Sequence, residues 1–187
     1  NNNTINKQKL NINIFLNEQC KDAITMEQFI NKIQITVDNL LVTKNKGLSE
    51  GVSNIFIENM KKLSLYERPI HCTDSKREII YIKHNSEKDA IDNKGKWLKD
   101  DENEKLKEAL NKVSFIQRKN LDKWVKDHPD WENNFNLQSE YIKLVKNCTE
   151  DLKENNNHNK IIRKVCNEIN INNKIGGRKC RIKKFNV

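Results

Sequence analysis

The chain has 187 residues, of which 35% are hydrophobic and 33% are charged, and its 35 lysines and arginines outnumber its 26 acidic residues to give a net charge of +9. This length suits one domain, or one domain with a small helical appendage, and the lack of a long apolar run argues against a membrane-spanning helix. The charge favours a polyanionic partner, although a chain rich in asparagine, isoleucine and lysine can also acquire it from genome composition alone.

Residues 1–9 are polar and rich in asparagine, and we interpret them as the end of a linker. The chain starts without an initiating methionine or a signal-peptide pattern, so we expect it to be part of a longer protein. Over residues 10–16 every second residue is aliphatic: Leu10, Ile12, Ile14 and Leu16 alternate with Asn11, Asn13 and Phe15. This period of two predicts a short N-terminal strand with one apolar face.

Three short helices are predicted to follow this strand. Thr25 can cap the first helix and Thr36 the second, which Gly47 would end. Apolar residues at steps of three and four predict the third helix over residues 48–63.

A small antiparallel β-hairpin is predicted after the helices, with strands at residues 70–72 and 78–84 and a third strand at 96–98. Three helices followed by a hairpin is the order of elements in a winged-helix domain, whose third helix can enter the major groove while the hairpin contacts phosphates. Glu50 and Glu58 would bring negative charge to that helix. We therefore favour a scaffold built of the same elements over a DNA-reading winged helix.

The rest of the chain is predicted to be helical, so the fold class is α+β and mainly helical. Residues 102–126 form a long helix whose narrow apolar stripe could pack against a partner chain or seat the last helices of the same chain. Two amphipathic helices follow, over about residues 137–152 and 161–169. The expected division is a linker end at 1–9, a core domain at 10–131, a C-terminal helical hairpin packed on the core at 132–173 and a basic tail at 174–187.

The basic tail carries the clearest functional pattern. Residues 174–187 contain six lysines and arginines and no acid, which is typical of a nucleic-acid or targeting segment. The predicted hairpin adds further cations. The predicted nucleic-acid-binding residues are Lys76, Arg77 and Lys83 in the hairpin and Lys174, Arg178, Lys179, Arg181, Lys183 and Lys184 in the tail.

Reactive residue types also occur together in the predicted hairpin, as His71, Cys72 and Asp74. Neighbouring residues of a strand point to opposite faces, so His71 and Cys72 cannot form a catalytic pair with each other. A buried Cys72 and a hydrogen-bonded His71 explain these residues without catalysis. We predict no catalytic residue, with a nuclease using His71 and Asp74 as an alternative.

The five cysteines are scattered without the regular spacing of a disulfide framework or the close pairs of a zinc site. We therefore expect reduced thiols, an intracellular setting, and no metal site or other cofactor within this chain. The cysteines are Cys20, Cys72, Cys148, Cys166 and Cys180.

Three segments resemble a domain of large DNA viruses of protists: LNINIFLNEQCKDA at residues 10–23, RPIHCTDSKR at 68–77 and WVKDHPDW at 124–131. The resemblance spans about residues 10–170 and identifies the chain as similar to the C-terminal domain of giant-virus zinc-finger-type proteins. It implies an upstream zinc finger with two cysteine and two histidine ligands and an asparagine-rich spacer. Zinc would then be bound before Asn1, by residues outside this chain.

These observations together predict a non-enzymatic viral module that contacts partners or assembles, and that holds nucleic acid, DNA more than RNA, through its tail and hairpin. The expected location is the viral factory, nucleus or virion of an infected host, and a homo-oligomer is an expected form. The alternative is a virion structural or genome-packaging scaffold.

Overall fold

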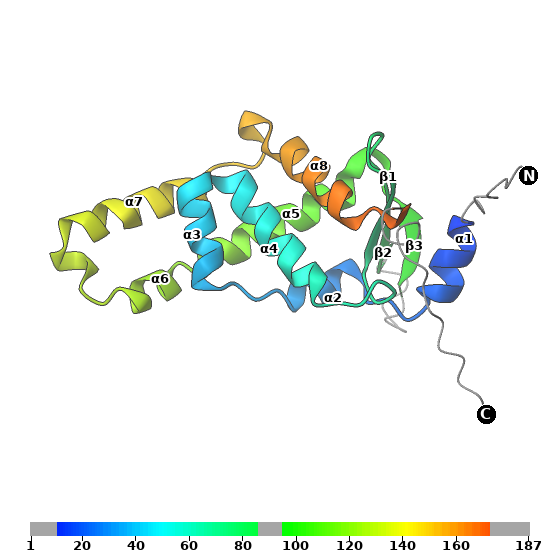
Figure 1. Cartoon of the computed structure of the whole chain (residues 1–187), viewed down its shortest axis with the longest axis horizontal. Helices are drawn as coiled ribbons and strands as arrows, with labels where there is room; N and C mark the ends of the chain where they lie inside the picture. The colour runs from blue at the N-terminus through cyan, green and yellow to red at the C-terminus, as the bar shows by residue number, and fades with distance from the viewer. Residues whose placement is uncertain (1–10, 86–94, 173–187) are drawn as a thin grey trace, which may run out of the picture.

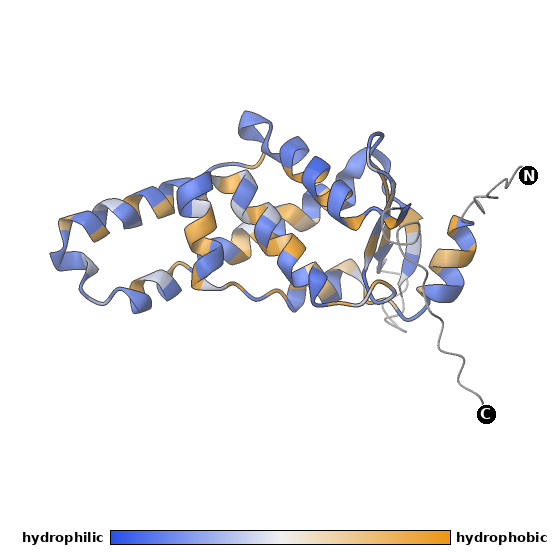
Figure 2. Cartoon of the chain, viewed as in Figure 1, coloured by the Kyte–Doolittle hydropathy of each residue, from blue (hydrophilic) through white to orange (hydrophobic). Residues whose placement is uncertain are grey.

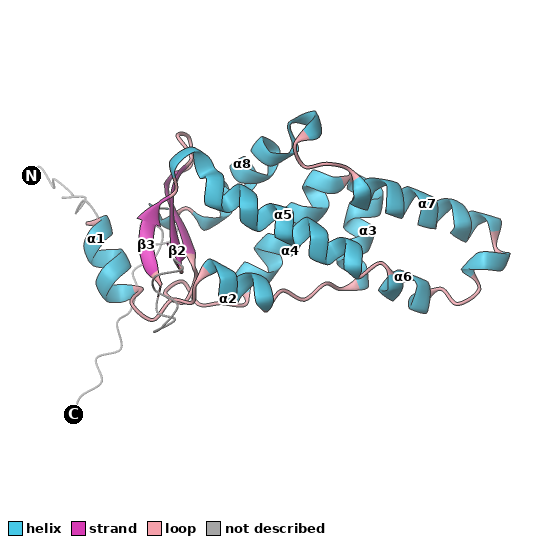
Figure 3. Cartoon of the chain, turned by 180° about the vertical axis from the view of Figure 1, so that it is seen from behind, coloured by secondary structure: helices cyan, strands magenta, loops and turns pink. Residues whose placement is uncertain are grey.

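A computed structural model describes residues 11–85 and 95–172. In these ranges a layer of helices packs against one face of a small sheet, and a short N-terminal helical segment covers the other face (Figures 1 and 3). The mainly helical α+β class predicted from the sequence is confirmed. None of the helices in these ranges is both long and apolar enough to cross a membrane.

Along the chain, helical segments both precede and follow the three strands of the sheet. Before the sheet lie α1 (Ile12–Ile14), the π-helical turn η1 (Phe15–Gln19), α2 (Met26–Asn31), α3 (Val37–Lys46) and α4 (Leu48–Lys61). After it lie η3 (Asp101–Asn103), α5 (Glu104–Lys119), α6 (Asp122–Asp127), η4 (Trp131–Asn133), α7 (Phe135–Thr149), η5 (Glu154–Asn156) and α8 (Asn157–Ile169).

The sheet contains β1 (Ile70–Asp74), β2 (Ile79–His84) and β3 (Lys96–Lys99), antiparallel and in that order. Ile70 pairs with Ile82 and Cys72 with Ile80, which turns these four side chains toward the helices. A register shift between Cys72 and Asp74 bends β1 where the turn to β2 begins. The predicted hairpin and its third strand are confirmed.

The predicted N-terminal strand is wrong. The Asn11 side chain accepts hydrogen bonds from the backbone N–H groups of Asn13 and Ile14, which caps a helical turn instead. Phe15, Leu16 and Cys20 then point the same way and are buried with Ile171 in a small second core on the outer face of the sheet. Helical rather than extended spacing brings these side chains together.

The capping residues Thr25 and Thr36 act as predicted. Each side chain accepts a hydrogen bond from the backbone N–H three residues on, and the side chain at that position accepts one in return from the backbone N–H of the threonine. These capping boxes fix where α2 and α3 begin. Gly47 then ends α3 with a φ of 88° that favours glycine, and α4 starts at once.

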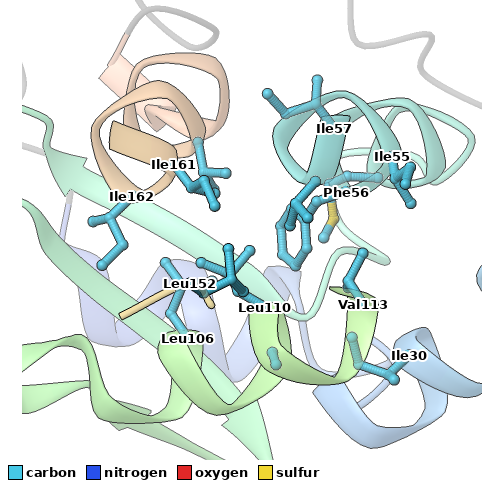
Figure 4. Close-up of a cluster of buried hydrophobic side chains, with 14 of the residues drawn as sticks. Ile30, Ile55, Phe56, Ile57, Leu106, Leu110, Val113, Leu152, Ile161 and Ile162 are labelled. Carbon is cyan, nitrogen blue, oxygen red and sulfur yellow. The ribbon is translucent and has the colours of Figure 1, made fainter. Parts of the chain in front are cut away.

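The main core lies between α4, α5 and α8, with α2 below them (Figure 4). Phe56 of α4, Leu110 of α5 and Ile161 of α8 point into one apolar cluster. Figure 2 shows the same arrangement, since the apolar residues of these helices face the interior and hydrophilic residues cover the outside. The stripe of α5 is therefore covered within its own chain, by α4 and α2 as well as by the last two helices, α7 and α8.

The predicted long helix over 102–126 is interrupted. α5 ends at Lys119, and α6 begins at Asp122 after a turn. α6, η4 and α7 together form an arm at one end of the molecule (Figure 1). α7 packs chiefly on α3, whereas α8 packs on α4 and β1, so the last two helices occupy separate parts of the core instead of pairing chiefly as a hairpin.

Candidate nucleic-acid interface

The β1–β2 turn presents two of the predicted nucleic-acid-binding residues to solvent. Asp74 Oδ1 accepts hydrogen bonds from the backbone N–H groups of Lys76 at 3.0 Å and Arg77 at 3.1 Å, which fixes the turn. Lys76 is exposed, and the Arg77 side chain is 81% exposed with its Nε 3.9 Å from Asp74 Oδ2. Both cations can therefore reach a phosphate without any change in the backbone.

Lys83 does not belong to this surface, and its prediction as a nucleic-acid-binding residue needs correction. The residue is only 5% exposed, and its Nζ donates hydrogen bonds to the carbonyl oxygens of Lys21 at 2.7 Å and Ala23 at 2.8 Å. Burial lowers the pKa of this amine. Lys83 is thus a structural residue that ties the segment after η1 to the sheet.

The last described residues before the basic tail, Asn170 to Asn172, lie against the end of β1. Asn170 forms a parallel bridge with Cys72, and the Asn172 side chain donates a hydrogen bond to the carbonyl oxygen of Thr73 at 2.8 Å. Ile171, between them, is buried in the second core. The six predicted tail residues lie outside the described residues, and Asn172, the last described residue before them, is bonded to Thr73 at the end of β1.

The exposed face of α8 adds cations that the sequence analysis missed. Lys160 and Arg163 are exposed on this face, and Lys164 is half-buried beside them. Arg163 Nε lies 3.9 Å from Glu78 Oε1 in the β1–β2 turn, which places α8 directly beside that turn. The sequence alone places these three residues opposite the apolar stripe of α8. It does not show which elements that stripe packs against.

A shallow hollow of about 370 Å³ lies along this part of α8. Its lining is basic and amide-rich apart from one carboxylate, that of Glu50, which forms an ion pair with Lys164. The lining residues are Glu50, Asn156, Asn159, Lys160, Arg163, Lys164 and Asn167.

The third helix, α4, is not placed to read DNA. It lies between α3, α5 and α8, and it buries residues on most of its circumference. Ser53 is buried and donates to the carbonyl oxygen of Ser49, while Asn54 and Glu58 hydrogen-bond to Asn39 of α3. The order of elements resembles a winged helix, but α4 serves as the central scaffold helix.

His71 and Cys72 point to opposite faces of the sheet, as predicted. His71 is buried between the rings of Phe15 and Trp97, with its Nε2 3.6 Å from Cys20 Sγ. Sequence reasoning missed this Cys–His contact because the two residues are 51 positions apart. Burial raises the pKa of the Cys20 thiol to about 11, so the sulfur stays protonated near neutral pH.

Cys72 lies on the other face of the sheet, buried against Cys166 of α8. The interaction between the two thiols lowers the pKa of Cys72 and, together with burial, raises that of Cys166. Both thiols are closed off from solvent. Within the described residues, no group of three or more His, Cys, Asp or Glu side chains is arranged to hold a metal ion.

Trp124 of α6 is a core residue. It is fully buried and stacks on His128, with ring centroids 4.1 Å apart. Trp131 is half-buried against Tyr141 at 4.6 Å. Both tryptophan rings pack against Tyr141 of α7, so they do not offer an exposed stacking platform for bases.

Comparison of the chain with known protein families, curated proteins and solved structures gives no match.

Proposed function

We propose that this chain is a non-enzymatic nucleic-acid-associated module, the C-terminal assembly or interaction domain of a viral zinc-finger-type protein. In this proposal it acts inside an infected host cell and contacts DNA in preference to RNA. The viral and zinc-finger context comes from the three sequence segments that resemble giant-virus proteins. The nucleic-acid contact is supported independently by the charge.

The distribution of charge is the observation that carries this proposal. Residues 174–187 contribute +6 of the net +9, which leaves +3 for the other residues. The chain enters this tail from Asn172, which is hydrogen-bonded to Thr73 beside the cations of the β1–β2 turn. Lys76 and Arg77 are exposed in the turn that follows Thr73, and we expect a polyanion bound by the tail to reach them as well.

The test is fluorescence anisotropy of a labelled DNA duplex at low salt, with the whole chain compared with residues 1–173. Loss of six cations should weaken binding by at least about tenfold, because each phosphate contact releases counterions. A Lys76→Gln/Arg77→Gln variant should lose less, and a Lys143→Gln/Lys146→Gln variant on the exposed side of α7 serves as the charge-matched control. Unchanged affinity after removal of the tail would refute the proposal.

A second candidate, a virion or packaging scaffold, is favoured by the exposed apolar side chains of the arm. Phe135 is 80% exposed and Ile142 is 67% exposed, and both lie on α7. Contact with a second copy of the chain would cover them. Light scattering coupled to gel filtration, without nucleic acid, should show a stable oligomer that a Phe135→Ser/Ile142→Ser variant disrupts. A monomer at high concentration would count against this function.

A further inference from the structure

We propose that the exposed face of α8 is a contact surface for double-stranded DNA and that the β1–β2 turn contacts the backbone beside it. This inference rests on the proposed function. It places the nucleic-acid contact on α8 and takes double-stranded DNA as the partner.

The face is built from residues at the spacing of one side of a helix. Asn159, Lys160, Arg163, Lys164 and Asn167 follow one another at steps of one, three, one and three, so their side chains lie together. The opposite side is buried in the main core through Ile161, Ile162, Val165, Cys166 and Ile169. Between Asn159 and Asn167, the outward side of α8 therefore carries only cationic and amide side chains.

Cationic and amide side chains are the types that commonly contact DNA. Lysine and arginine neutralise phosphates, while asparagine can hydrogen-bond to the edge of adenine. α8 has 13 residues, which gives a length of about 20 Å. The major groove of B-DNA, about 12 Å wide, admits a helix, whereas the deep, narrow major groove of A-form RNA does not. The geometry therefore favours a DNA duplex over an RNA duplex.

The β1–β2 turn supplies the second contact. α8 packs on β1, and Arg163 lies beside Glu78, which follows Arg77 in the turn. A duplex lying on α8 would meet Lys76 and Arg77 on its adjacent backbone. A helix with a neighbouring hairpin is the arrangement expected of a winged helix, but here α8 and not α4 takes the position next to the nucleic acid.

Nearby carboxylates reduce the positive charge of this surface but do not cancel it. Glu50 pairs with Lys164, Glu78 with Arg163, and Glu168 with Lys61 at 3.3 Å. Neither Lys76 nor Lys160 forms an ion pair with another residue in the ranges that the structure describes. The Arg163 side chain is 78% exposed and its Nε is 3.9 Å from the half-buried Glu78 carboxylate, a separation long enough for a phosphate to replace that carboxylate.

The test uses the whole chain with Lys160→Gln, Arg163→Gln and Lys164→Gln together, because glutamine removes charge and favours helix. Lys126→Gln, Lys143→Gln and Lys146→Gln in the arm form the control, with the same change in net charge. Anisotropy is measured on a DNA duplex of about 20 base pairs, its single strand and an RNA duplex of the same sequence. Circular dichroism checks that each variant is folded.

The α8 variant should bind the DNA duplex about tenfold more weakly than the control variant, and the slope of log K on log salt should fall by about 2 to 3 in magnitude. Binding of the single strand should change as little as in the control. A single Lys160→Glu variant, at a position without an ion pair, should weaken duplex binding in the same direction. This variant keeps the test decisive if the triple variant unfolds.

Equal losses for the α8 and control variants would overturn the α8 surface while leaving the proposed function in place. A loss confined to the single strand or the RNA duplex would overturn double-stranded DNA as the partner. Failure of the unmodified chain to bind any of the three ligands at low salt would overturn the proposed function, and this inference with it.

Discussion

Gly51 of α4 lies against Thr43 of α3 with no space for a side chain between them. A Cβ atom at residue 51 would stand 2.7 Å from Thr43 Cβ and 3.0 Å from Thr43 Cα, both closer than packed carbon atoms approach. Thr43 is itself buried, and its Oγ1 accepts a hydrogen bond from Gln117 of α5 at 2.8 Å. This contact sets how closely α3 packs on the central helix.

A Gly51→Ala substitution should therefore destabilise the protein by about 2–3 kcal/mol, although alanine favours helix by about 1 kcal/mol over glycine. Urea unfolding measures the change. Gly47→Ala is the comparison, because no neighbouring atom lies within 4 Å of its Cβ position and its cost comes only from the φ of 88°. A Gly51→Ala protein as stable as the unmodified chain would show that α3 and α4 are not packed this closely.

Asp100 is expected to stabilise the start of α5. Its two carboxylate oxygens accept hydrogen bonds from the backbone N–H groups of Lys105 and Leu106, each at 2.9 Å, and the residue is buried. Asp100→Ala would leave two donors unpaired near the helix start and should cost about 1–3 kcal/mol. Asp101→Ala removes an exposed carboxylate next in the chain and should change thermal stability by about 0.5 kcal/mol or less. Equal effects of the two substitutions would argue against this role for Asp100.

His158 should make the protein less stable in mild acid. Burial, followed by the nearby charge of Lys107, lowers the pKa of His158 below its ordinary value in the folded chain. The unfolded chain then binds the proton more readily, so the contribution to stability is complete above about pH 6.5 and is lost as pH falls through the folded pKa.

A His158→Gln variant should therefore lose less stability than the unmodified chain between about pH 7.5 and pH 5. Glutamine can still donate a hydrogen bond to Asn111 Oδ1, which lies 3.1 Å from His158 Nε2. Chemical denaturation at several pH values measures the difference. Parallel pH profiles for the two proteins would exclude a perturbed His158.

The cysteines of the described residues should be unreactive in the folded protein. Cys20, Cys72, Cys148 and Cys166 are all buried, and burial raises the pKa of the Cys20 and Cys148 thiols to about 11. In a Cys180→Ser chain, which removes the one cysteine outside those residues, a disulfide reagent should react with none of them until urea is added. Rapid reaction of any one thiol under native conditions would reveal an opening that the structure does not show.

Local features of the fold could be predicted from the sequence. Thr25 and Thr36 form capping boxes whose partners lie three residues away, so these helix starts are specified within one turn of chain. In the sequence, Ile80 and Ile82 alternate with Tyr81, which is the pattern of a strand with one face on the core, and both isoleucines are buried there. The basic turn at Lys76 and Arg77 followed from the same local pattern.

Features that depend on distant segments could not be predicted in this way. The residues at 10–16 fit either a strand or a helix. The chain is helical there because Asn11 caps the first turn and because Phe15 is buried in the second core. Lys83 was expected to face solvent because nothing in its own strand indicates that Lys21 and Ala23 cover it. The surface of α8 required the knowledge that its apolar side packs on α4 and β1.

The salt dependence of DNA binding by the whole chain tests nucleic-acid contact most directly. Neutralisation of about four to six phosphates by the tail gives a slope of log K on log salt of about −4 to −5, and contacts from the β1–β2 turn and α8 would make it steeper. Anisotropy of a short labelled duplex at several salt concentrations measures this slope. A slope near zero, or no binding at low salt, would contradict the account and leave the charge of +9 without a role in binding.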